Sequence, residues 1–292
     1  MNELSVEINA IDKFRYKLLM DERSEATVSK YTHDVKCFFE HLGGRHVSRE
    51  EILSYKEHLG SRYAISSANS MIAALNSFLK FLKREDLCVK QFRVQRDAYC
   101  AEKRELSKEE YFSLIETARK KKNERLGLII ETICSTGIRI SELGAITAEA
   151  LKNGEATVNC KGKFRRIFLP SALCKKLACY AISRGIKKGA VFITSRGKPV
   201  SRCSVWRDMK SLCADAGVPA SKVFPHNLRH LFARTFYGIE HDIVKLADVL
   251  GHSNIETTRI YVMTSGSEHR KKIENMGLVV KIKKRAVNNS FT

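Results

Sequence analysis

The sequence predicts a mainly helical protein with a small β component, in which an all-α first part precedes a helix-dominated α+β second part. Apolar residues recur at helical spacing along most of the chain. By contrast, residues 156–170 show the pattern of a β-hairpin with a basic turn. The 292 residues are 43% hydrophobic, which is enough for two domains that each bury a core.

The first hundred residues predict four helices with short connections, which together form a small helical domain. Gly43-Gly44 interrupts the apolar spacing after the second helix. Ser48 followed by Glu51 has the pattern of a capping box and starts the third. The predicted helices are 4–18, 28–42, about 48–59 and about 66–82.

The apolar periodicity stops near residue 90 and resumes near residue 106. We therefore predict a first domain over 1–90, a linker over 91–105 and a second domain over 106–276. An ordinary surface loop would show the same pattern as this linker. Residues 277–292 form a basic C-terminal tail.

The second domain is predicted to begin at a capping box formed by Ser107 and Glu110. Gly137 closes its second helix, and Pro170 ends the hairpin. The predicted elements are helices 108–121 and 124–135, strands ATVNC and RIFLP joined by the turn KGKFR, helix 171–184, a short strand AVFIT, and further helices to about residue 276.

The charge is strongly positive and unevenly distributed. The chain has 52 Lys and Arg against 32 Asp and Glu, a formal net charge of +20. Residues 1–100 carry 16 against 14, whereas residues 101–292 carry 36 against 18. A solubilising surface is one explanation, but a polyanionic partner explains the excess better, with nucleic acid favoured over a membrane.

Several classes of protein are excluded by missing patterns. The sequence has no apolar run long enough to span a membrane, and its N-terminus lacks the features of a signal peptide. The nine scattered cysteines form no CxxC pair, which favours reduced thiols in a cytoplasmic protein. Walker A, GxGxxG and HExxH motifs are absent, so we expect neither a cofactor nor a metal.

The segment STGIRISELGAI places Arg139 three residues before Glu142. Such a pair is often a surface salt bridge. Here the surrounding residues are apolar, which predicts partial burial. A partly buried arginine beside a carboxylate is more typical of anion recognition.

The segment FPHNLRHLFARTF carries His226, Arg229 and His230 near one face of a helix that starts close to Pro225. Taken alone, such a cluster is more often structural than catalytic.

In LADVLGHSNIETTRIYV, Gly251 ends one helix, His252 lies in the turn, and Ser253 with Glu256 caps a helix that carries Tyr261. Considered singly, Tyr261 is a core or interface residue. Lys161, in the hairpin turn, is by itself an exposed lysine.

Together these residues suit metal-free phosphoryl transfer. Cationic groups would stabilise the charge on a pentavalent phosphorus, and a tyrosine would be the covalent nucleophile.

In the motifs TGIRISEL, CKGK, HNLRH and LGHSNIETTRIY the sequence resembles the tyrosine recombinases, the family of phage integrases, transposon integrases and Xer-type recombinases. The resemblance spans both predicted domains. It implies an N-terminal four-helix core-binding domain and an α+β tyrosine-recombinase catalytic domain. The catalytic set that it implies is Arg139, Lys161, His226, Arg229, His252 and Tyr261, with Glu142 and His230 as supporting residues.

The resemblance also implies a mechanism. Tyr261 attacks a phosphodiester and leaves a 3′-phosphotyrosyl bond, while the two arginines hold the phosphate oxygens and Lys161 protonates the 5′-oxygen. His226 would assist as an acid–base or positioning group, and His252 would hydrogen-bond the phosphate.

The implied partner is double-stranded DNA with specific core sites. It would be held by a homotetramer on two duplexes, or by a hetero-oligomer with a paralogue. The tail would pass to a neighbouring subunit, although a disordered basic tail would have the same sequence.

The function expected is site-specific recombination: integration and excision, or resolution. A type IB-like topoisomerase and a catalytically silent DNA-binding regulator are the alternatives.

Overall fold

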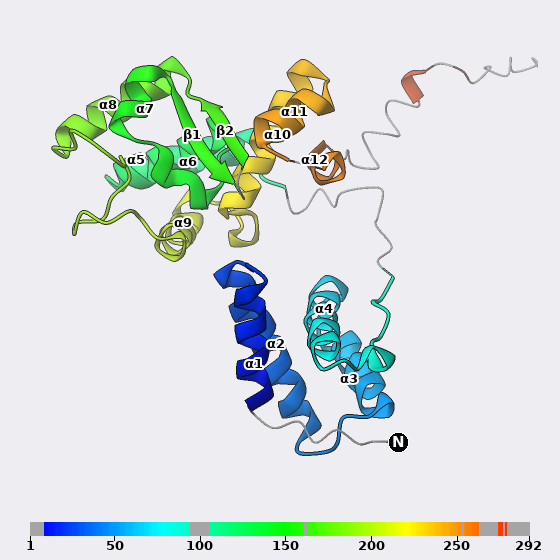
Figure 1. Ribbon diagram of the computed structural model, residues 1–292. Helices are drawn as coiled ribbons and strands as arrows, with labels where there is room; N and C mark the ends of the chain where they lie inside the picture. The colour runs from blue at the N-terminus through cyan, green and yellow to red at the C-terminus, as the bar shows by residue number, and fades with distance from the viewer. Residues whose placement is uncertain are drawn as a thin grey trace, which may run out of the picture. The chain divides into compact units, whose positions relative to one another are not determined.

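A computed structural model describes residues 9–93, 105–160, 163–252, 254–262, 274–276 and 278. The chain divides into two compact units, Met1–Arg96 and Asp97–Thr292 (Figure 1). The described part is mainly helical with a single antiparallel hairpin, so the predicted fold class is confirmed.

The first unit contains the helices that the apolar spacing predicts. They are α1 (Asn9–Met20), α2 (Glu25–Leu42), α3 (Arg49–Arg62) and α4 (Ile65–Phe81), followed by the short 3₁₀ helix η1 (Glu85–Leu87). Gly43 ends α2 in the left-handed conformation, with φ of +59°. The Ser48 hydroxyl accepts a hydrogen bond from the Glu51 amide and so caps α3.

The core of this unit surrounds α4, which packs against both α2 and α3. Phe78 on α4 meets Phe14 on α1 edge to face, with ring centroids 5.2 Å apart. Two asparagines of α4 then hold the extended chain that follows η1. Asn76 exchanges hydrogen bonds with the backbone of Val89, and Asn69 does so with Phe92.

In the second unit, α6 packs against four other helices. The elements are α5 (Lys108–Lys120), α6 (Glu124–Thr136), η3 (Ile140–Ala145), α7 (Ala148–Asn153), β1 (Glu155–Cys160), β2 (Lys163–Phe168), α8 (Ser171–Ser183), α9 (Arg202–Ala216), η4 (Ala220–Lys222), α10 (Pro225–Glu240), α11 (Ile243–Leu250) and α12 (Ile255–Val262). The capping box between Ser107 and Glu110 is present at the start of α5. α6 contacts α5, α8, α9 and α10. No described helix combines the length and the apolar content needed to cross a bilayer.

The hairpin differs from its predicted form. Strand β2 begins at Lys163, so the predicted turn KGKFR is too long, and its last residues belong to the strand. Glu155 pairs with Phe168 and Cys160 with Lys163. The basic residues resemble a turn in sequence, but Phe164 and Arg166 are exposed, and strand pairing continues through them.

The predicted strand AVFIT does not form a strand. Ala190 and Ile193 each make one isolated β-bridge, to Thr147 and to Pro199. Val191 and Phe192 are buried in the core of the unit. The run is therefore apolar because it is buried, and not because it pairs as a strand.

Helix ends converge at one place in the second unit. α6 ends at Gly137 and α11 ends at Gly251, both with positive φ. α10 contacts α6, α11 and α12. Figure 1 shows α10, α11 and α12 grouped on the β2 side of the hairpin. Seven of the predicted site residues lie in this region.

Candidate active site

Arg229 lies at the centre of the cluster, on the second turn of α10. Its side chain is 1% exposed. Nη1 donates to the carbonyl of Gly137 at 2.5 Å, and Nη2 donates to the carbonyl of Leu250 at 2.6 Å. These carbonyls end α6 and α11, where the helix dipole favours a cation. Burial, and then the charge of Arg139, lower the pKa of Arg229 to about 10, so the guanidinium stays charged at neutral pH.

Arg139 precedes the 3₁₀ turn η3 and is paired with Glu142. Glu142 Oε1 accepts from Nη1 of Arg139 at 2.9 Å, and Oε2 accepts from the Arg139 backbone N–H at 2.9 Å. The Glu142 side chain is 8% exposed and that of Arg139 is 31% exposed. The pair is therefore not an ordinary surface salt bridge, because the acid is buried and the arginine reaches the surface.

A third arginine, Arg165 on β2, joins this pair and was not anticipated from the sequence. Nη2 donates to Glu142 Oε2 at 2.6 Å, and Nη1 donates to the carbonyl of Val249 at 2.5 Å. Arg165 pairs in register with buried Val158, and it alternates with exposed Phe164. The period of two could have identified it, because it shares the inward face with Ile167. Because the sequence pattern assigns residues 161–165 to the turn, it does not predict that Arg165 is buried.

The C-terminal end of α11 receives one hydrogen bond from each of these arginines. The carbonyls of residues 249, 250 and 251 accept in turn from Arg165, Arg229 and Arg139, the last at 3.5 Å. A helix C-terminus leaves such carbonyls without helical partners and carries partial negative charge. The folded chain thus gathers three cations around one helix end before any anion binds.

His252 follows this helix end and contacts Arg229. Its Nε2 lies 2.9 Å from Nη2 of Arg229, and its Nδ1 lies 2.9 Å from the hydroxyl of Thr258. Thr258 is buried on α12 and was not singled out from the sequence. Burial, followed by the charges of Arg229 and Arg139, lowers the pKa of His252 to about 4. The ring is therefore neutral at pH 7.

Tyr261, on α12, lies inside this cluster, with 4% of its surface exposed. Its hydroxyl is 3.4 Å from Nε2 of His226. Its ring centroid is 4.1 Å from that of His230 and 5.4 Å from that of His252. α12 therefore brings the tyrosine to the histidines and to Arg229 within a single chain.

The histidines on α10 are also held neutral. Burial lowers the pKa of His226, and the nearby charges of Arg229 and Arg139 add to this. Burial and His226 lower the pKa of His230 to about 4. A neutral His226 can accept a proton from the phenol, which a protonated imidazole could not do.

Seven of the eight predicted site residues come together in this cluster: Arg139, Glu142, His226, Arg229, His230, His252 and Tyr261. The eighth, Lys161, and the predicted cap residue Ser253 lie outside the described residues. The described strands end and begin on either side of the lysine, at Cys160 and Lys163. Within the described chain, no group of His, Cys, Asp or Glu is arranged to hold a metal ion.

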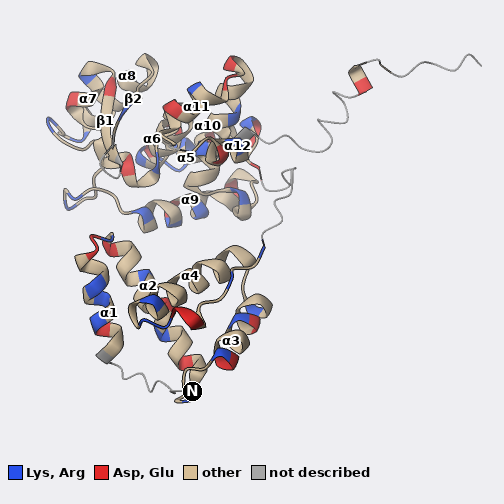
Figure 2. Cartoon of the chain, turned by 45° about the vertical axis from the view of Figure 1, so that its right-hand side comes forward, with Lys and Arg blue, Asp and Glu red and all other residues tan. Residues whose placement is uncertain are grey.

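A surface hollow of about 660 Å³ adjoins the cluster at His226. α9 supplies Arg202, Trp206 and Arg207 to its lining. Figure 2 shows Lys and Arg along α9. The surface next to the cluster is therefore basic, as a polyanionic partner requires.

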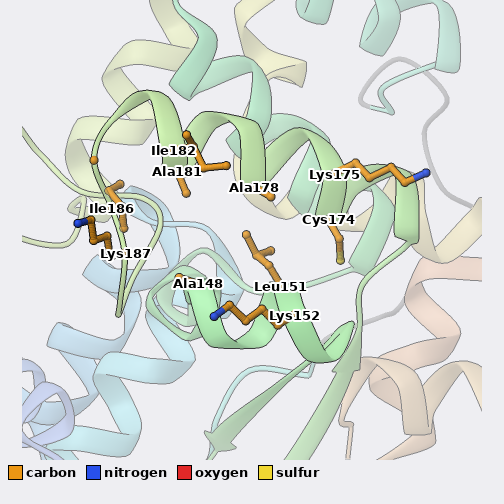
Figure 3. A pocket seen from close by; sticks show the side chains of 11 residues that line it. Ala148, Leu151, Lys152, Cys174, Lys175, Ala178, Ala181, Ile182, Ile186 and Lys187 are labelled. Atoms are coloured by element: carbon orange, nitrogen blue, oxygen red, sulfur yellow. The ribbon is translucent and has the colours of Figure 1, made fainter.

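A second hollow, of about 640 Å³, lies between α7 and α8 (Figure 3). Leu151, Ala178 and Ile182 give it an apolar lining, and Lys152 lies at its edge. It contains none of the predicted site residues.

Two family models match the chain. The model described as phage integrase family matches residues 104–268, more than half of the chain. The model described as phage integrase, N-terminal SAM-like domain matches residues 11–86.

Similar proteins extend these matches over nearly the whole chain. The tyrosine recombinase XerA of Pyrococcus furiosus is 27% identical over 288 residues, which cover 96% of this chain and 98% of the relative. The tyrosine recombinase XerC of Roseiflexus castenholzii is 30% identical over 269 residues, covering 83% and 85%.

Solved structures share the fold. A lambda integrase dimer bound to a COC′ core site has a TM-score of 0.71 at 16% identity, covering 95% of this chain and 99% of that one. The XerH site-specific recombinase bound to difH substrate has a TM-score of 0.68 at 19% identity, covering 93% and 85%. By the family matches and these relatives, the chain belongs to the phage integrase family, as a tyrosine recombinase.

Proposed function

We propose that this recombinase cuts and rejoins double-stranded DNA at specific core sites through a 3′-phosphotyrosyl intermediate on Tyr261. The observation that carries the proposal is the position of the Tyr261 hydroxyl, 3.4 Å from a neutral His226 and beside the buried Arg229. A nucleophile, a proton acceptor and a cation for the phosphate are thus already adjacent.

In the first step the Tyr261 oxygen attacks phosphorus, and the bond to the 5′-oxygen breaks. His226 Nε2 takes the phenolic proton, and Lys161 gives a proton to the departing 5′-oxygen. Arg139 and Arg229 bind the non-bridging oxygens, whose charge grows in the pentavalent transition state. A 5′-hydroxyl from a second duplex then attacks the phosphotyrosine and restores the phenol.

His252 has to change its hydrogen bonds when the phosphate arrives. Its Nε2 faces Arg229, which can only donate, so this nitrogen accepts and Nδ1 carries the proton. The Thr258 hydroxyl at Nδ1 can donate as well as accept. Once Arg229 turns to the phosphate, the proton can move to Nε2, and His252 then donates to a phosphate oxygen.

The remaining residues and segments are assigned supporting roles in this proposal. Glu142 orients Arg139, and His230 packs the Tyr261 ring. Residues 1–90 would hold the core DNA, residues 91–105 would link the two domains, and residues 106–276 would cleave. The tail, 277–292, would contact a neighbouring subunit.

We also propose that a homotetramer holds two duplexes, with a hetero-oligomer containing a paralogue as the alternative. Support comes from relatives whose solved structures contain a dimer on a core site or a recombinase on its difH substrate. The cytoplasm is the proposed compartment. No observation favours a type IB-like topoisomerase or a catalytically silent regulator.

Covalent capture tests the proposal. A pool of nicked duplexes with randomised sequence is incubated with the protein, and DNA that remains attached in SDS is recovered and sequenced. We expect enrichment of one inverted-repeat sequence, attached through Tyr261. Tyr261→Phe should bind the selected duplex but trap none. Trapping by Tyr261→Phe, or no adduct with the wild-type protein, would contradict the proposal.

A further inference from the structure

We propose that Arg165 is a positioning residue of the active site, which shares the charge of Glu142 so that Arg139 stays available for phosphate. The inference rests on the proposed function and assigns a role to an arginine outside the predicted catalytic set. It is carried by contacts among buried charged groups.

The carboxylate of Glu142 accepts hydrogen bonds from the guanidinium groups of both Arg139 and Arg165. Glu142 Oε1 accepts from Arg139, whereas Oε2 accepts from Arg165 at 2.6 Å and from the Arg139 backbone N–H at 2.9 Å. Both oxygens are therefore engaged, and the plane of the carboxylate is fixed by groups on η3 and β2. Without Arg165, Oε2 of Glu142 would accept only from the backbone N–H of Arg139.

The two arginines differ in exposure, and this decides which one can meet DNA. The Arg165 side chain is 8% exposed, as is that of Glu142, but that of Arg139 is 31% exposed. A buried charge is costly unless it is paired, so Arg165 and Glu142 satisfy each other inside the protein. The outer guanidinium of Arg139 then retains net positive charge toward solvent, where a phosphate would bind.

Arg165 also fixes the distance between the hairpin and the end of α11. Nη1 donates to the carbonyl of Val249, and the aliphatic part of the side chain lies against Gly251. A Cβ built on Gly251 would lie 2.4 Å from Cδ of Arg165. The close approach requires glycine at that position. It ties β2, which follows Lys161 in the chain, to the helix end that binds Arg139 and Arg229.

The test compares Arg165→Met with Arg166→Met on the full chain. Methionine keeps much of the length of the side chain and removes its charge and its hydrogen bonds. Arg166 is the next residue on β2, is 69% exposed and lies 3.7 Å from Glu155 at the surface. Arg166→Met therefore serves as the control, because it also removes one arginine from β2 but leaves the contacts of Glu142 unchanged.

Each protein is assayed on two substrates made from the captured core duplex. One has the natural scissile phosphodiester, and the other has a methylphosphonate, in which a methyl group replaces one non-bridging oxygen and removes the charge. The ratio of the two single-turnover cleavage rates does not depend on the fraction of protein that is folded. A variant that is merely less stable therefore leaves the ratio unchanged.

If Arg165 acts through Arg139, Arg165→Met should slow phosphodiester cleavage by about 10- to 100-fold. The methylphosphonate has less charge for Arg139 to stabilise, so its rate should fall much less. The ratio of phosphodiester to methylphosphonate rates should therefore drop about 10-fold or more, whereas Arg166→Met should keep the wild-type ratio.

A second variant isolates the shared carboxylate. In Arg165→Met/Glu142→Gln the uncompensated buried carboxylate is absent, so this protein should cleave no more slowly than Arg165→Met alone. An unchanged rate ratio in Arg165→Met, or multiplicative losses in the double variant, would overturn the proposal. Failure of the wild-type protein to form any Tyr261 adduct would instead overturn the proposed function.

Discussion

Nη2 of Arg229 and Nε2 of His252 lie 2.9 Å apart, and this contact fixes the protonation state of the histidine. Arginine has no acceptor, so the imidazole nitrogen that faces it carries no proton. Thr258 holds the other nitrogen. Arg229 is therefore already hydrogen-bonded to protein groups. Under the proposed function, a bound phosphate would have to replace some of these partners.

Replacing Arg229 with lysine should remove most of the activity although the charge is kept. Lysine has one donor nitrogen on a shorter side chain, whereas Arg229 uses two, Nη1 for the carbonyl of Gly137 and Nη2 for the carbonyl of Leu250 and for His252. We expect single-turnover cleavage to fall about 100- to 1,000-fold. DNA affinity, measured by filter binding, should fall far less. Near-normal cleavage by Arg229→Lys would show that the fork geometry of the guanidinium is not needed.

Gly251→Ala and Gly154→Ala form a matched pair of substitutions. Both glycines have positive φ, at +64° and +69°, so alanine should cost about 1–2 kcal/mol of stability at either position. Gly154 has open space around the added methyl group, whereas Gly251 has Arg165 within 2.4 Å. Gly251→Ala should also slow cleavage, measured on folded protein, and Gly154→Ala should not. Equal activity of the two would argue against the tight contact.

The stability of the second unit should fall as the pH is lowered from 7 to 5. His230 and His252 have folded pKa values of about 4, below the unfolded value near 6.5. The unfolded chain therefore binds more protons across this window, so the stabilisation is complete above pH 6.5 and is lost as the pH falls towards 4.

Urea unfolding followed by Trp206 fluorescence reports on this unit alone, because the chain has a single tryptophan. His230→Phe should make the pH dependence shallower. An unchanged slope in that variant would contradict the assignment to His230.

Cleavage should proceed at the same rate in excess EDTA as with Mg²⁺. In the proposed mechanism, guanidinium groups neutralise the phosphate and a lysine is the general acid. No step therefore requires a metal ion. Covalent adduct formation on a nicked duplex is the measurement. A strict requirement for Mg²⁺ in strand cleavage would contradict this mechanism.

DNA affinity should depend steeply on salt. The second half of the chain carries most of the formal charge of +20, and each phosphate that it neutralises releases counterions. For a complex with six or more phosphate contacts, the dissociation constant should rise about 1,000-fold between roughly 50 and 200 mM salt. Titrations by fluorescence anisotropy would measure this. A flat response would exclude extensive phosphate contact.

Local patterns predicted the framework of the fold well. Helical spacing placed α2 and α10 on the correct segments, and the glycines at 43, 137 and 251 end helices as expected. These features depend on residues within a few positions of one another, which is why sequence alone suffices. The motifs also named seven residues that the fold brings together from the start and first turn of η3, from α10, from the turn after α11 and from α12.

Features that depend on distant partners were missed. Arg165 is buried because Glu142 and Val249 accept its hydrogen bonds, and neither is near it in sequence. Thr258 became part of the site through His252. The apolar run 190–194 was mistaken for a strand, because burial in a helical core leaves the same composition as strand pairing.

The arginine cluster at the end of α11 has a mechanical consequence. Four of its hydrogen bonds run to backbone carbonyls at the C-terminal ends of α6 and α11, and all four acceptors precede α12 in the chain. The proposed nucleophile, Tyr261, lies on the helix that follows, beyond Gly251. Under the proposed function, withdrawing α12 would remove Tyr261 from the site but leave these four hydrogen bonds in place. A protomer could then bind DNA without being able to cleave it.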